Sequence, residues 1–151
     1  MVISSVAAQQ NQTTEQWRAK FDNEPDPVRK AKLLPPLGDS EFKDTEIALA
    51  NDKNAEALDI LKKYLDEVQS CEKALEEKIP DAEKHANGYK QLQMSLRVSL
   101  RRLDAMIVGL TADERQPFVE IRGQLDEIDR HLIQKLFPKQ PANDDAGKPK
   151  R

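Results

Sequence analysis

Apolar residues recur at steps of three and four positions through three long segments of the chain, at residues 54–79, 82–110 and 112–136. Steps of this size place side chains on one face of an α-helix, so each segment is predicted to form an amphipathic helix. Pro80 ends the first helix, Asp81 is the candidate cap of the second, and a Thr-x-x-Glu capping box at Thr111 starts the last. Gly88 weakens the first turns of the second helix, so a firm start nearer Tyr89 is the alternative. The three stripes comprise Leu58, Leu61, Leu65, Val68, Leu75 and Ile79; Tyr89, Leu92, Leu96, Ser99, Leu103, Met106 and Leu110; and Phe118, Ile121, Leu125, Ile128, Leu132 and Leu136.

Short connections between such helices favour side-by-side packing in opposite directions. The predicted fold class is all-α: an antiparallel bundle of three long helices, with short N-terminal helices packed on the central one. A chain with 34% charged and 38% hydrophobic residues suits amphipathic helices of this kind. We expect a single helical-bundle domain at residues 13–137, a disordered N-terminus at residues 1–12 and a disordered tail at residues 138–151.

The segment NEPDPVRKAKLLPPLGDSEF, residues 23–42, contains four prolines. Its Asp-Pro pair at Asp26 is typical of a helix start, because aspartate caps a helix and proline suits the first helical position. The Pro-Pro pair at residues 35–36 is predicted to end this helix, since proline lacks the backbone N–H and restricts the residue before it. Gly38 then turns the chain into another short helix, at residues 41–50. We interpret the prolines as helix punctuation and not as a PxxP ligand.

Another short helix is predicted for TTEQWRAKF, residues 13–21, with a threonine cap. The predicted central helix carries a second apolar stripe of Met94, Val98, Ala105 and Val108, away from the first stripe. A helix with two apolar faces is buried on two sides. We therefore expect the short N-terminal helices to fold back and cover the second stripe.

The central helix is also basic, because residues 84–103 include Lys90, Arg97, Arg101 and Arg102 but no acidic residue. One interpretation is charge matching with the acidic helices on either side, which fixes their pairing order. The alternative is an anion or phosphate site formed by these four residues. Nucleic-acid binding is not expected, since the net charge is −3 and this helix offers a single aromatic residue for base stacking.

Metal-binding and catalytic patterns are not recognisable in the sequence. Neither histidine belongs to a Glu-x-x-His motif; His85 follows Asp81 by four positions and His131 follows Glu127 by four, so both are expected to form surface pairs. The single cysteine, Cys71, is expected to be a small core residue and not a reactive thiolate. We therefore expect no catalytic residue, no bound metal and no cofactor.

Two resemblances add to these predictions. The segment EIALANDKNAEALDILKKYLDEV resembles one helix-turn-helix unit of the tetratricopeptide family, with Ala57 and Leu61 near the packing positions. No second copy follows at the family's spacing of about 34 residues, so the resemblance implies a peptide-binding groove between helices and not a solenoid. The segments DPVRKAKLLPPLGDSEF and GYKQLQMSLRVSLRRLDAMI resemble uncharacterised bacterial helical proteins that begin with an export signal. That resemblance favours an exported, periplasmic location over a cytoplasmic one and implies no activity.

The first residues, MVISSVAAQQ, allow two interpretations: a disordered N-terminus, or the tail of an export signal with small residues before the cleavage site. No apolar run reaches the roughly 18 residues that a transmembrane helix needs. The sequence predicts a non-enzymatic interaction or scaffolding protein with a protein partner. The alternative is anion, phosphate or nucleic-acid binding through the basic patch on residues 82–110.

Overall fold

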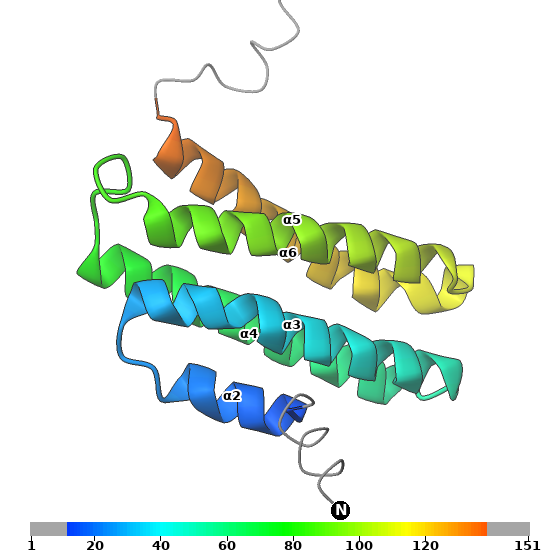
Figure 1. Ribbon diagram of the computed structural model, residues 1–151. Helices are drawn as coiled ribbons and strands as arrows, with labels where there is room; N and C mark the ends of the chain where they lie inside the picture. The colour runs from blue at the N-terminus through cyan, green and yellow to red at the C-terminus, as the bar shows by residue number, and fades with distance from the viewer. Residues whose placement is uncertain (1–11, 139–151) are drawn as a thin grey trace, which may run out of the picture.

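The computed structural model describes residues 12–138, and within this range it contains five α-helices and no β-strand (Figure 1). The helices are α2 (Thr14–Asp22), α3 (Pro27–Ala50), α4 (Asn54–Lys78), α5 (Asn87–Val108) and α6 (Ala112–Leu136). The predicted all-α bundle is confirmed. Among the described residues, no helix has the length and apolar character that crossing a membrane requires. The two segments predicted to be disordered lie outside the described residues, apart from Gln12 and Pro138.

The four long helices occupy the corners of the bundle, with α3 and α5 on one side and α4 and α6 on the opposite side (Figure 1). α3 and α6 each pack against α4 and α5, whereas α4 and α5 lie diagonally and share little contact although they are consecutive. The bundle therefore consists of two antiparallel helical hairpins, α3–α4 and α5–α6. We call the contact between these hairpins the hairpin seam; across it, α3 runs parallel to α5 and α4 runs parallel to α6 (Figure 1).

The Pro-Pro pair at residues 35–36 does not end a helix, contrary to our prediction, because α3 continues through it over 24 residues. The bundle thus has four long helices instead of three, and α2 is the one short helix among the described residues. A proline in a helix interior costs about 3 kcal/mol, since a backbone hydrogen bond is lost. Burial on both sides offsets this cost: Ala31, Leu34, Leu37 and Phe42 are at most 1% exposed, and each large apolar side chain contributes about 1.5–3 kcal/mol when buried.

Gly38 also lies inside α3 and not in the turn that we predicted. It is buried, and a Cβ atom at this position would stand 2.9 Å from Cε1 of Tyr64. A side chain here would collide with the tyrosine ring, so glycine allows the close approach of α3 to α4. The physical reason for this glycine is therefore packing and not backbone freedom.

Three of the predicted helix starts, after Thr13, Asp26 and Thr111, are confirmed by their capping contacts. Asp26 Oδ2 accepts a hydrogen bond of 2.9 Å from the backbone N–H of Arg29, in the first turn of α3. Reciprocal capping boxes form at Thr13, before α2, and at Thr111, before α6. Local sequence determines these helix starts because both partners of each cap lie within one helical turn.

The connection between α4 and α5 is longer than predicted. α5 begins at Asn87, close to the alternative start near Tyr89 and not near residue 82, and Asp81 Oδ1 caps only a turn, where it accepts a hydrogen bond of 3.1 Å from Lys84 N. Residues 79–86 therefore form a connection between two helices that lie diagonally across the bundle. This placement differs from the simple neighbour-to-neighbour order that we predicted for consecutive helices.

The apolar stripes predicted for the three long segments form the core. Every member is buried except Leu58 and Ile79, which are half-buried and pack against the core. The N-terminal helix α3 contributes a fourth buried face to the same core. Helical periodicity in the sequence was therefore sufficient to predict the buried side of each of these three helices.

The second apolar stripe of α5 is not covered, contrary to our prediction. Met94, Val98 and Val108 are 60%, 50% and 74% exposed, and Ala105 is also exposed. The short helix α2 packs on α3 and not on the central helix, while α3 runs beside α5 and leaves the stripe outside the contact. The stripe is therefore an apolar surface on α5.

Candidate functional site

A groove of about 260 Å³ lies between α3 and α5 and reaches α4 at its floor. We call it the α3–α5 groove; it follows the hairpin seam on the side of the bundle that α3 and α5 form. Most of its wall is apolar, and the exposed residues Met94 and Val98 belong to it. Its lining comprises Leu34, Pro35, Gly38, Asp39, Phe42, Tyr64, Gln91, Met94, Ser95, Val98, Ser99 and Arg102.

The floor of the groove is formed by Tyr64, whose hydroxyl group shares a hydrogen bond with Ser99 Oγ. The Tyr64 ring meets Phe42 edge to face, with the ring centroids 5.3 Å apart. Burial raises the pKa of Tyr64, so the phenol stays neutral. Ser95 Oγ is buried and has no hydrogen-bond partner among residues 12–138. The floor is therefore apolar with one unsatisfied hydroxyl group, which a polar group of a bound molecule could satisfy.

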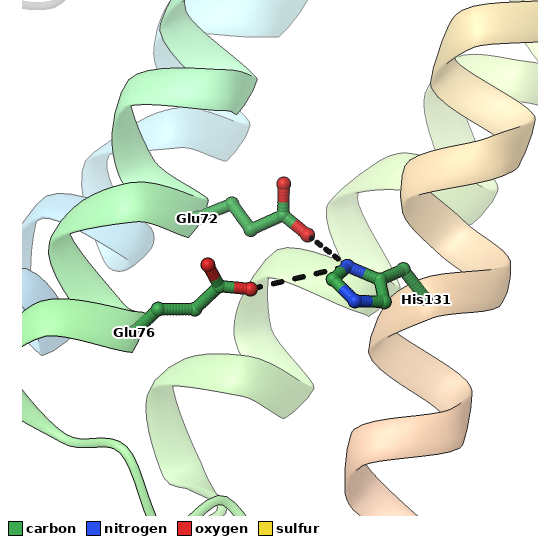
Figure 2. A group of neighbouring side chains, drawn as sticks. All are labelled: Glu72, Glu76 and His131. Carbon is green, nitrogen blue, oxygen red and sulfur yellow. Dashed lines mark hydrogen bonds and ion pairs between the residues drawn. The ribbon is translucent and has the colours of Figure 1, made fainter.

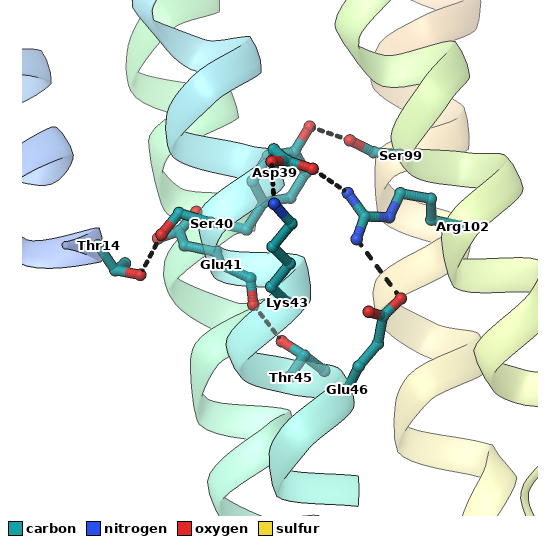
Figure 3. Close-up of polar contacts among 10 residues, drawn as sticks. Thr14, Asp39, Ser40, Glu41, Lys43, Thr45, Glu46, Ser99 and Arg102 are labelled. Atoms are coloured by element: carbon teal, nitrogen blue, oxygen red, sulfur yellow. Dashed lines mark hydrogen bonds and ion pairs between the residues drawn. The ribbon is translucent and has the colours of Figure 1, made fainter. Parts of the chain in front are cut away.

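Arg102 lies at the rim of the groove and connects α5 to α3 across the hairpin seam (Figure 3). Its guanidinium donates to Asp39 Oδ1 at 2.8 Å and lies 3.4 Å from Glu46 Oε2, both on α3. It also lies over the Phe42 ring, 5.2 Å from the centroid. Although burial acts in the opposite direction, Lys43 and Arg102 hold the pKa of Asp39 below its ordinary value. Arg102 is therefore engaged in a structural contact.

The other three predicted site residues, Lys90, Arg97 and Arg101, are exposed and have no ion-pair partner within residues 12–138. Burial raises the pKa of the Asp129 carboxyl group on α6. Arg97 lies near enough to this carboxyl group to act against the rise. Lys90, Met94, Arg97 and Arg101 follow one another at helical steps of four, three and four, so they share a face of α5. Of the four predicted site residues, Arg102 is therefore paired with α3. The other three have no ion-pair partner among residues 12–138 and lie beside the exposed apolar stripe of α5.

A second polar centre, which sequence analysis missed, lies buried between α2, α3 and α4. Arg18 Nη2 donates to Glu41 Oε2 at 2.7 Å, and Arg18 Nε donates to Glu67 Oε2 at 3.0 Å. Glu41 is fully buried and Glu67 is 7% exposed. The sequence does hold a signal for this centre, because Glu41 takes a core position at helical spacing from Leu37 and Thr45, which are also buried.

Both glutamates of this centre have pKa values above the ordinary value of a glutamate. Burial above all, and then the neighbouring Glu67, raise the pKa of Glu41 to about 9, against the opposing effect of Arg18. Burial also raises the pKa of Glu67, but hydrogen bonds from Glu41 and Arg18 lower it. Glu41 is therefore the protonated partner near neutral pH, and Glu67 is the carboxylate that Arg18 neutralises.

Neither histidine forms the i,i+4 pair that we predicted. His131 Nδ1 lies 2.9 Å from Glu72 Oε2 and 3.9 Å from Glu76 Oε2, both on α4 (Figure 2). His85 lies in the connection at residues 79–86, where its backbone N–H donates to the carbonyl oxygen of Asp81 at 3.0 Å and the Asp81 side chain accepts from Lys84 N instead. His131 pairs with α4 because this adjacent helix offers closer partners than α6 itself does, whereas the residues around His85 are not helical.

Cys71 is buried in the core, as predicted. Burial raises the pKa of its thiol to about 12, although Lys30 acts in the opposite direction. The thiol therefore stays protonated at neutral pH, and it packs as a small apolar group.

The described residues thus form a helical bundle with an apolar groove on one side, three unpaired cations on the exposed face of α5, and a buried centre of Arg18, Glu41 and Glu67 beneath α2. Comparisons with known protein families, with curated proteins and with solved structures found no match. The titratable side chains of the groove lining are Tyr64, which is neutral, and Asp39 and Arg102, which are paired with each other.

Proposed function

We propose that this protein is a non-enzymatic helical interaction protein that binds an amphipathic helix of a protein partner in the α3–α5 groove. The observation that carries the proposal is the exposure of Met94 and Val98 beside a concave apolar surface. Exposed apolar side chains next to such a groove are typical of helix-in-groove recognition, where a partner helix buries one apolar face.

The charges beside the exposed apolar stripe of α5 define the partner further. Lys90, Arg97 and Arg101 have no ion-pair partners among residues 12–138, whereas Asp39, the carboxylate that lines the groove, is already paired. The unpaired charge on the exposed face of α5, next to Met94, is therefore positive. Complementary charges steer a partner and fix its orientation, so we propose a partner helix with acidic residues beside its apolar face.

Two other functions have less support. Anion or nucleic-acid binding through the same basic residues would lack Arg102, which is held by α3, and base stacking would lack a platform because Tyr64 and Phe42 are buried. Catalysis would need a general base or an activated nucleophile in the groove. The hydroxyl groups of Ser95 and Ser99 have no histidine or free carboxylate beside them in the groove lining.

The proposal predicts selective binding of an acidic amphipathic peptide. We would label a designed helical peptide of about 18 residues, with leucines on one face and glutamates beside them, and measure its binding by fluorescence anisotropy. A peptide with the same leucines and lysines in place of the glutamates is its matched control. We expect the acidic peptide to bind at least about tenfold more tightly, which corresponds to about 1.4 kcal/mol.

Variants locate the binding surface. Val98→Asp is expected to abolish binding, since it places a charge against the apolar face of the peptide and repels its glutamates. Ile47→Asp, at a similarly exposed apolar residue of α3 outside the groove lining, is expected to leave binding unchanged. The proposal is contradicted if both variants bind like the wild type. It is also contradicted if a single-stranded oligonucleotide binds more tightly than the peptide, loses affinity steeply with salt and is insensitive to Val98→Asp.

A further inference from the structure

Three potential metal ligands meet on the side of the bundle opposite the α3–α5 groove, where α4 lies beside α6 (Figure 2). Glu72 and Glu76 lie one helical turn apart on α4, and His131 reaches them from α6. One ligand atom from each residue lies within 4.8 Å of the other two. Two helices from different hairpins thus place three donors around one point.

We propose that Glu72, Glu76 and His131 form a binding site for a divalent transition-metal ion of the zinc class. One imidazole nitrogen and two carboxylate oxygens suit Zn²⁺, which accepts mixed nitrogen and oxygen ligands and commonly keeps a fourth position for water. Mg²⁺ and Ca²⁺ prefer oxygen ligands alone, so the imidazole favours the transition metal.

The distances fit this ion after a small adjustment of the side chains. His131 Nδ1 lies 2.9 Å from Glu72 Oε2 and 3.9 Å from Glu76 Oε2. Ligand atoms bound to zinc at about 2.0–2.2 Å stand somewhat more than 3 Å apart, which lies between these two distances. The side chains of Glu72, Glu76 and His131 are 15%, 34% and 55% exposed, so the site is supported by the protein on one side and open to an entering ion on the other.

The environment of Glu76 supports the proposal. Its Oε2 atom is shielded from solvent and makes no hydrogen bond among the described residues. Lys135 Nζ lies 3.1 Å from this oxygen as an ion pair, without hydrogen-bond geometry. The ammonium group of Lys135 already pairs with the Glu76 carboxylate, so it competes with a metal ion for this ligand.

A bound ion would connect the two hairpins, because its ligands come from α4 and α6. Binding to the folded protein alone raises its thermal stability as the metal concentration rises. The sequence did not indicate this site, since the two helices that supply its ligands are separated along the chain by all of α5. This proposal is independent of the groove on the opposite side.

The test uses the full chain without an affinity tag, titrated with ZnCl₂ in a calorimeter, with thermal unfolding as a second readout. We expect binding at one ion per chain and a rise in the melting temperature that a chelator reverses. His131→Ala is expected to weaken binding by at least about tenfold, since even the groups that only orient metal ligands contribute about 10–100-fold. His85→Ala is the matched control and is expected to bind zinc like the wild type.

A further variant is expected to tighten zinc binding instead of weakening it. Lys135→Ala removes the competing ammonium group from Glu76 and is expected to tighten zinc binding severalfold. Glu72→Gln provides an independent loss of binding if His131→Ala fails to fold. The proposal is overturned if His131→Ala and Glu72→Gln bind zinc like the wild type, if His85→Ala abolishes binding, or if MgCl₂ stabilises the chain as much as ZnCl₂ does.

Discussion

Arg18→Ala is expected to lower the free energy of unfolding by about 3–5 kcal/mol near pH 8, the cost of removing one partner from a buried ion pair. Arg18 is the cation that contacts both Glu41 and Glu67, and these two carboxyl groups are almost completely shielded from solvent. Without the guanidinium, the charge on Glu67 stays in a poorly solvated position with no compensation. The short helix α2 also loses its ionic contacts with α3 and α4.

The size of this loss depends on pH. Burial gives Glu41 a pKa of about 9 in the folded protein, against an ordinary value of 4.5, so the folded state binds a proton that the unfolded chain releases. The stability that this proton contributes is fully present below about pH 4.5 and is lost as pH rises toward about 9. In Arg18→Ala both carboxyl groups lose their cation and retain protons even more strongly. The difference between wild type and variant should therefore be smallest near pH 5 and largest near pH 9.

Chemical denaturation followed by circular dichroism, repeated across this pH range, measures the effect. Lys20→Ala is the matched control, because Lys20 lies on the same helix and is exposed, with its ammonium group 4.9 Å from the centroid of the Trp17 ring. Its loss should cost no more than about 0.5 kcal/mol, as is usual for surface substitutions. Equal stabilities of the two variants at pH 8 would show that the buried centre does not hold α2 in place.

Leu96→Ala is expected to lower the free energy of unfolding by about 2–5 kcal/mol, because it removes a buried side chain and leaves a cavity. Leu96 is fully buried in the stripe of α5 that faces the core. Leu65→Ala, at the corresponding stripe of α4, should lie in the same range. A matched truncation of an exposed residue, Ile47→Ala, should change stability by less than about 0.5 kcal/mol. A loss below that value at both leucines would mean that these stripes do not form the core.

The parts of the fold that sequence analysis predicted correctly depend on nearby residues. The stripes from Leu61 to Leu75 and from Phe118 to Leu136 are buried as expected, since their periodicity is a property of each helix alone. The caps at Asp26 and Thr111 are equally local. The Pro-Pro pair was misleading because its local cost is real, but the burial of α3 against two other helices outweighs it.

The candidate sites could not be predicted because they join helices that are distant in the sequence. In the sequence, Met94 and Val98 look like part of a second buried face of α5. Only the position of α3 shows that they are exposed. The partners of Arg102 lie more than fifty residues away, on α3. His131 has an acidic residue four positions before it, yet its contacts are with α4. Helical spacing specifies which face a side chain occupies but not which helix lies opposite.

The stacking of two hairpins across one seam also gives the folding reaction an order. Residues 51–53 and 109–111 close the two hairpins with short loops, and short loops lose little entropy on closing. Contacts within each hairpin should therefore form early, because folding is fastest for partners near in sequence. The parallel contacts α3–α5 and α4–α6 should form last. Stopped-flow measurements should then show that seam variants such as Arg102→Ala accelerate unfolding, whereas they leave the folding rate almost unchanged.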